Sequence, residues 1–157
     1  MKRAVVYYSL TDNTKEAAEY IVGKIDADLY KIELVKPMPS SFGKQIFLGG
    51  MQSSMGMTPK IKEIPIDVEK YDEIIIGTPI WAGNAASPIN TLLKKYNVAD
   101  KITAVFTFSG GGDNDKCILA LEKVLKNMKT NVALADRKSD LSSSNQEKLD
   151  KFIEELN

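Results

Sequence analysis

The sequence predicts an α/β protein with a three-layer, doubly wound fold, in which a five-stranded parallel sheet has the strand order 2-1-3-4-5. Apolar runs alternate with helical patterns along the whole chain, which is typical of a parallel sheet covered by helices. Two runs, at 73–77 and 102–108, are short and continuously apolar, as expected for strands buried on both faces. The length of 157 residues suits one domain spanning residues 1–157, and no internal repeat divides the chain.

The periodicity of apolar residues places the individual elements. Strands are expected at 3–8, 28–34, 73–77, 102–108 and 131–136. Helices are expected at 14–25, 86–96, 115–128 and 145–156. The buried face of the first helix would consist of Ala17, Ala18, Ile21, Val22 and Ile25. Ser144 and Glu147 have the spacing of a capping box at the start of the last helix.

Residues 36–60 interrupt this alternation and are rich in methionine, glycine and proline. A helix is predicted at about 41–53, although Gly43, Gly49 and Gly50 weaken it. A connection of this length is usually functional or disordered. Since Phe42, Ile46, Phe47 and Leu48 would not be left in water, we expect a packed lid. The alternative is a crossover helix of variable sequence without a special role.

Composition excludes several classes of function. Lys plus Arg and Asp plus Glu both total 21, so no net charge attracts nucleic acid or an anionic membrane. No apolar run approaches the length of a membrane span. The apolar residues after Met1-Lys2-Arg3 are too few for a signal peptide, so we expect a cytoplasmic protein.

The absence of histidine excludes Ser-His and Cys-His catalytic pairs as well as histidine metal ligands. A single cysteine, Cys117, excludes a cysteine zinc site, and we expect no metal. Cys117 is interpreted as a buried structural residue in a helix, with a reactive thiol as the alternative. Any chemistry must therefore come from carboxylates, hydroxyls, the backbone or a borrowed cofactor.

In an open α/β sheet, ligands bind outside the carboxyl ends of the strands, where the strand order reverses. The first loop there opens a helix and consists of Ser9, Leu10, Thr11, Asp12, Asn13 and Thr14. Free amides and the positive end of the helix dipole favour an anion at such a place, and three hydroxyls add donors. The alternative is a plain capping box, with Asn13 as the N-cap and Glu16 as its partner.

The second loop at this edge consists of Thr78, Pro79, Ile80, Trp81, Ala82, Gly83 and Asn84. Its Trp81 is the only tryptophan of the chain, and at the end of a buried strand it is placed to stack on a flat ring. Gly83 would let the neighbouring backbone approach a ligand closely.

The third loop consists of Ser109, Gly110, Gly111, Gly112 and Asp113. Three glycines in a row are explained if bare backbone must hydrogen-bond a polar ring edge, with a permissive turn as the alternative. Asp113 is also a candidate N-cap of the following helix. Together the three loops describe an anion cradle, a stacking platform and a backbone edge, which suit a flat ring carrying one phosphate. FMN is the obvious candidate.

The chain resembles the flavodoxin-like FMN-binding family over essentially all its residues. Residues 9–14 are similar to that family's phosphate loop, (S/T)-x-T-G-N-T, while 77–83 and 109–113 resemble its two ring-binding loops. The resemblance implies the flavodoxin-like fold, a phosphate held by residues 9–14, Trp81 against the ring, and backbone at 82–84 and 110–112 at its polar edge. It also implies that the flavin carries the electrons, with no catalytic side chain.

Two features depart from that family's pattern. Asp12 stands where glycine is usual; its carboxylate would repel the phosphate by roughly 1–5 kcal/mol if it pointed inward, so we expect it to point outward. The chain is neutral with a pI near 6.3, whereas electron-carrying flavodoxins are typically acidic. This neutrality, with no second aromatic in the third loop, favours an FMN-dependent NAD(P)H:quinone or flavin reductase over an electron carrier.

Other functions on related folds fit the sequence less well. A response-regulator receiver needs acidic residues after the first and third strands, where this chain has Tyr8-Ser9-Leu10 and Gly77-Thr78-Pro79. A Rossmann site needs G-x-G-x-x-G after the first strand, which is missing. A flavin-free binding or scaffold protein remains as the alternative because of Asp12. The expected partners are a redox protein or an NAD(P)H or quinone-like substrate, with the chain as a monomer or homodimer.

Overall fold

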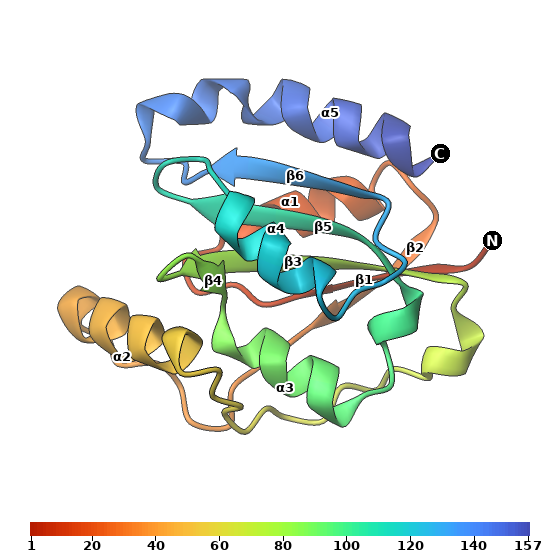
Figure 1. Ribbon diagram of the computed structural model, residues 1–157. Coiled ribbons are helices and arrows are strands. Elements are labelled where there is room, and N and C mark those ends of the chain that lie inside the picture. Colours follow the sequence, from red (N-terminus) through yellow and green to blue (C-terminus); the bar gives the residue numbers. More distant parts are fainter.

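The computed structural model describes residues 1–157 and contains a parallel sheet with the strand order β2-β1-β3-β5-β6 (Figure 1). Its strands are β1 (Arg3–Tyr7), β2 (Ala27–Lys31), β3 (Glu73–Trp81), β5 (Ile102–Ser109) and β6 (Thr130–Ala135). Counted along the chain, these five parallel strands have the predicted order. The sequence did not predict β4 (Asn84–Ala85), which pairs antiparallel with the end of β3.

Helices cover both faces of the sheet and complete the three layers (Figure 1). The helices are α1 (Asn13–Val22), α2 (Phe42–Ser54), α3 (Ser87–Lys95), α4 (Asp115–Glu122) and α5 (Asn145–Leu156), with 3-10 turns η1 (Val68–Lys70), η2 (Ala99–Lys101) and η3 (Asp140–Ser144). One apolar cluster joins the sheet to α1 and α5, and another joins its opposite face to α3 and α4. α4 ends six residues before the predicted boundary at 128, because the chain turns after Glu122. No helix is both long enough and apolar enough to cross a bilayer.

Alternation along the central strands explains how both faces are filled. Ile74 and Ile76 belong to the α3/α4 side, while Ile75 between them belongs to the α1/α5 side. The next residue in the strand must be a glycine. A Cβ on Gly77 would lie only 2.1 Å from Phe106 Cζ of the neighbouring strand. The glycine thus makes room for a fully buried phenylalanine at the paired position.

Two predicted capping boxes do not form. Asp12, in the left-handed conformation with φ 66°, precedes α1 as its N-cap, and Asn13 is already helical. Glu16 bonds Arg137 instead of reaching back to the loop. At α5, Ser144 has helical backbone angles (φ −91°, ψ −3°) as the end of η3, and its hydroxyl donates to the carbonyl of Leu141 and accepts no bond from the helix amides.

The prediction that the large side chains of α2 are packed is wrong for three of the four residues, since only Leu48 is half-buried. Phe42, Ile46 and Phe47 are 74%, 59% and 73% exposed, whereas the buried residues of this helix are Gly49 and Ser53. α2 approaches the end of β3 through this small-residue face, which lets its backbone come close to Trp81. Its bulky side chains are therefore exposed, and two of them, Phe42 and Ile46, line the pocket described below.

Candidate functional site

The carboxyl ends of the strands surround a pocket of about 260 Å³ that draws on all three predicted loops. The pocket is lined by Leu10, Thr11, Phe42, Gln45, Ile46, Gly50, Pro79, Ile80, Trp81, Ala82, Phe108, Ser109, Gly110 and Asp136. Leu10 and Thr11 come from the first loop, Pro79–Ala82 from the second, and Ser109 and Gly110 from the third. Thr11 and Trp81 therefore line a single pocket, as the convergence of the loops requires.

The first loop presents an uninterrupted row of free amides. The backbone N–H groups of residues 9–14 donate to no acceptor within the chain. The Ser9 hydroxyl accepts from the Lys15 amide at 3.2 Å, which ties the loop to the first turn of α1. Because these amides lie at a helix N-terminus, they form a ready anion site.

Asp12 keeps this loop in the conformation that a glycine would adopt. Its φ of 66° lies in the left-handed region, which aspartate tolerates better than most residues. The residue is exposed, as expected, and its side chain makes no hydrogen bond within the chain.

The second loop is a β-hairpin rather than an open loop. Thr78–Trp81 still belong to β3, and the strand returns as β4 after a two-residue turn at Ala82 and Gly83, whose φ values are 49° and 77°. Two positive φ values match the type I′ turn that twists with its strands. The amides of both turn residues are free, so they face solvent or a ligand.

Not every residue of the hairpin reaches the pocket. The Thr78 hydroxyl is used inside the hairpin, where it accepts from the Ala86 amide at 3.0 Å and donates to the Pro79 carbonyl at 2.8 Å. Gly83 packs against Lys116, since a Cβ there would lie 2.7 Å from Lys116 Cδ. Asn84 lines a different pocket.

Trp81 is held from two sides while it lines the pocket. The backbone of Gly49 lies against its six-membered ring, where a Cβ would come within 3.0 Å of Cδ2. The Tyr8 ring meets the indole edge to face, with centroids 5.6 Å apart and an interplanar angle of 87°. These contacts fix the indole at the hairpin end in a defined orientation.

The third loop is a tight turn whose outer backbone is open. The Gly112 amide donates to the Ser109 carbonyl at 3.3 Å, and Gly112 has φ 66°. The amides of Gly110 and Gly111 have no acceptor in the chain, and a Cβ on Gly111 would meet nothing within 4 Å. Asn114, not Asp113, is the N-cap of α4, although the Asp113 carboxylate accepts from the Asp115 amide at 3.0 Å.

Sequence reasoning missed several residues at this site. Asp136, directly after β6, lines the pocket and accepts from Asn13 Nδ2 at 3.4 Å. Burial raises the pKa of the Asp136 carboxyl above its usual value, against the opposing effect of the Asn13 hydrogen bond. Phe108, Phe42, Gln45 and Ile46 also line the pocket. Asp136 and Phe108 end predicted strands, which was the available signal for them, whereas Phe42 and Ile46 belong to the segment expected as a lid and were not assigned to the site.

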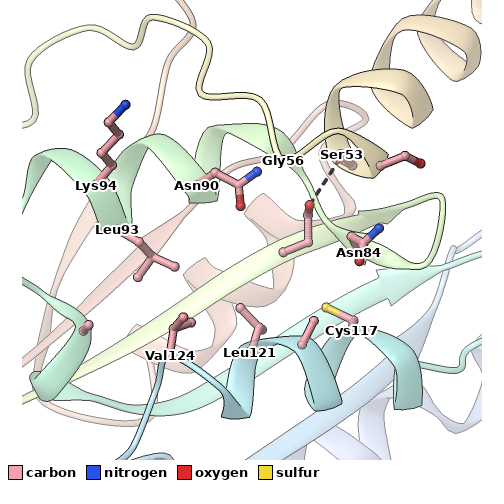
Figure 2. A pocket seen from close by; sticks show the side chains of 13 residues that line it. Ser53, Gly56, Asn84, Asn90, Leu93, Lys94, Cys117, Leu121 and Val124 are labelled. Atoms are coloured by element: carbon pink, nitrogen blue, oxygen red, sulfur yellow. Dashed lines mark hydrogen bonds between the residues drawn. The ribbon is translucent and has the colours of Figure 1, made fainter.

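A second pocket, of about 570 Å³, lies between α3 and α4 and contains none of the first-loop or third-loop residues. Leu93, Leu121 and Val124 point into it, while Lys94 points away (Figure 2). Cys117 lies at its floor, fully buried as predicted. Burial raises the pKa of that thiol to about 11, so it stays protonated and unreactive at neutral pH.

Comparison with known proteins finds flavodoxins and other flavoproteins. A model of the flavodoxin family matches residues 2–156. A flavoprotein from Lactobacillus acidophilus, solved in complex with FMN, is 25% identical, with a TM-score of 0.71 over 94% of this chain and 97% of that one. A protein from Bacteroides eggerthii with a provisional assignment as a flavoprotein is 26% identical, with a TM-score of 0.76 over 96% and 97%. An archaeal flavodoxin at 18% identity and a TM-score of 0.54 over the full length of both chains shares the fold. No curated protein matches the chain.

Proposed function

This chain belongs to the flavodoxin family, a family of FMN-binding flavoproteins, and we propose that it binds FMN in the pocket at the carboxyl ends of β1, β3 and β5 and transfers electrons through it. The observation that carries the proposal is the row of six free amides at residues 9–14 beside a pocket that also holds Trp81. An anion and a flat ring are the two parts of FMN, and these features suit one each.

In this proposal, each loop has a separate task. The amides of residues 9–14 hold the phosphate, and Trp81 with Phe42 and Ile46 provides apolar contact for the ring. The free amides of Ala82 and Gly110, which line the pocket, donate to the polar edge of the ring. Six of the predicted site residues support these loops without lining the pocket: Ser9, Asn13, Thr14, Thr78, Asn84 and Gly112.

The bound flavin would supply the redox chemistry, and the chain would supply binding, orientation and exclusion of water. No side chain of the pocket is proposed as a catalytic acid or base. Tyr8, behind Trp81, is poorly suited to such a role because burial raises the pKa of its phenol to about 12.

The exposed apolar face of α2 supports direct contact with an electron donor or acceptor. Phe42, Ile46 and Phe47 stand in water beside the pocket, which is unusual for a surface without a partner. We propose that this face meets a redox protein or a hydrophobic substrate such as a quinone. Neutral overall charge favours a reductase, because long-range steering of a charged partner is weak.

Two measurements test this proposal. Purified protein reconstituted with FMN and passed through a desalting column should remain yellow, with one flavin per chain. A protein that loses all flavin absorbance at low salt would contradict FMN binding. For the holoprotein, oxidation of NAD(P)H with a quinone and no added reductase identifies an enzyme. Its absence, together with rapid reduction by a separate flavodoxin reductase, identifies a carrier.

A further inference from the structure

Arg137, two residues beyond β6, holds the phosphate loop from outside. Its Nη2 donates to the carbonyl oxygen of Thr11 at 3.2 Å, and its Nη1 lies 2.6 Å from Glu16 Oε1 in the first turn of α1. No other cationic side chain donates to the backbone of residues 9–14. Lys15, which is nearest in sequence, lies 4.0 Å from Glu19 instead.

The contact with the Thr11 carbonyl determines where the next amide points. In a planar trans peptide, the carbonyl of Thr11 and the N–H of Asp12 lie on opposite sides. Arg137 binds the carbonyl, so the Asp12 amide is turned away from the guanidinium, and it is one of the six free amides of the loop. The hydrogen bond also polarises the peptide, which makes this amide a stronger donor.

The Arg137 guanidinium also lies close to two negatively charged residues at this loop. Asp12 replaces the glycine that is usual in the loop, and Glu16 lies one turn into α1. Both carboxylates would disfavour a bound phosphate dianion, and Arg137 is paired with one of them and bonded to the residue before the other.

We propose that Arg137 is a positioning residue for the FMN phosphate: it orients the Thr11–Asp12 peptide and offsets the carboxylates of Asp12 and Glu16. This inference rests on the proposed function and adds to it a residue that acts through the loop. It explains how the loop tolerates an aspartate at position 12. The guanidinium lies outside the pocket lining, so its effect should depend on the phosphate and not on the ring.

The test compares FMN with riboflavin, which lacks the phosphate, by quenching of Trp81 fluorescence. Arg137→Gln should weaken FMN binding about five- to tenfold and riboflavin binding less than about twofold. The FMN deficit should narrow as NaCl increases, because salt screens an exposed charge. Lys138→Gln removes the same charge from the next, exposed residue and should change neither affinity more than about twofold.

A double-mutant cycle isolates the link to Asp12. Asp12→Gly should improve FMN binding less than about twofold in the wild type, but about three- to fivefold in the Arg137→Gln background. Equal effects in both backgrounds would show that Arg137 does not offset Asp12. An Arg137→Gln protein that loses FMN and riboflavin affinity equally, or loses neither, would overturn the proposal.

Inorganic phosphate separates this inference from FMN binding as a whole. A wild-type protein that fails to bind FMN refutes the proposed function, yet the loop can still be tested by titrating phosphate and following backbone amide resonances. The amides of Thr11 and Asp12 should shift in the wild type and shift much less in Arg137→Gln. Identical shifts in both proteins, or none in either, would contradict the role of Arg137.

Discussion

The backbone of Gly49 in α2 lies so close to the indole of Trp81 that a Cβ at Gly49 would come within 3.0 Å of Trp81 Cδ2. This approach sets the distance between α2 and the hairpin end that together form one wall of the pocket. It also explains why a helix with poor intrinsic propensity is retained here, since a larger residue would displace either the helix or the indole.

Alanine at Gly49 should therefore act differently from alanine at Gly43 in the same helix. Gly49→Ala should lower the free energy of unfolding by about 1 kcal/mol, because overpacking outweighs the gain in helix propensity. Gly43→Ala meets nothing within 4 Å and should raise it by up to about 1 kcal/mol. Urea unfolding measures both, and only Gly49→Ala should shift the Trp81 emission. An equal stabilisation by both variants would contradict the contact.

Phe42 and Phe47 form a matched pair for the flavin wall, since they are 74% and 73% exposed but only Phe42 lines the pocket. Phe42→Ala should weaken both FMN and riboflavin binding by about 1 kcal/mol, or roughly fivefold, because a ring contact is lost. Phe47→Ala should leave both affinities within about twofold. Neither variant should change the free energy of unfolding by more than about 0.5 kcal/mol. Equal losses of affinity in both variants would place the ring elsewhere.

Asp136 should make the apoprotein less stable as pH rises. Burial raises the pKa of the folded carboxyl above the ordinary 3.8, so the folded state binds more protons than the unfolded state between the two values. The stability this provides is present below pH 3.8 and is lost as pH rises through the folded pKa. In thermal unfolding measured between pH 3.5 and 8, the Asp136→Asn variant should not show this loss of stability with rising pH. Asp140→Asn, at an exposed carboxylate, should leave the wild-type profile unchanged.

Glu73 should give the opposite pH dependence. Burial alone would raise its pKa, but hydrogen bonds from Lys129 Nζ at 2.7 Å and Arg3 Nε at 3.1 Å hold that pKa below its ordinary value. The resulting stability is present above pH 4.5 and is lost as pH falls through the folded pKa.

Glu73→Gln should lower the free energy of unfolding by about 1–3 kcal/mol at pH 7, because it leaves the largely buried Arg3 guanidinium without its carboxylate. The difference should shrink as pH falls through the folded pKa of Glu73, because the native carboxyl then becomes protonated. Glu63→Gln breaks an exposed pair with Lys95 and should lower the free energy of unfolding much less than Glu73→Gln does at pH 7. Equal costs at positions 63 and 73 would mean that burial of Glu73 has no energetic consequence.

The sheet and the meeting of its three loops could be predicted because continuous apolar runs identify buried parallel strands. The orientation of α2 could not, since its contact face consists of glycine and serine and depends on the shape of Trp81. β4 has only two residues, too few for a periodic signal. The predicted caps are wrong because Asp12, not Asn13, precedes α1 in a left-handed conformation, and because Ser144 has helical rather than extended backbone angles.

Contacts between residues that are far apart in the sequence also could not be predicted from local patterns. Arg137 reaches Thr11 and Glu16 across more than a hundred residues, and Asp136 reaches Asn13 likewise. Nothing in the spacing of neighbouring residues marks such pairs. They depend on how the connections run beyond the edge of the sheet, because β3 and β5 lie between β1 and β6 in the strand order.

Titration of the apoprotein with FMN, followed by Trp81 fluorescence, tests the central claim most directly. Trp81 is the only tryptophan and lines the same pocket as Thr11, so a flavin bound there should quench most of the emission at one equivalent per chain. Riboflavin should quench it too, but at higher concentration, because the free amides of residues 9–14 would have no phosphate to bind. Unchanged emission at saturating FMN would show that the pocket does not hold the flavin.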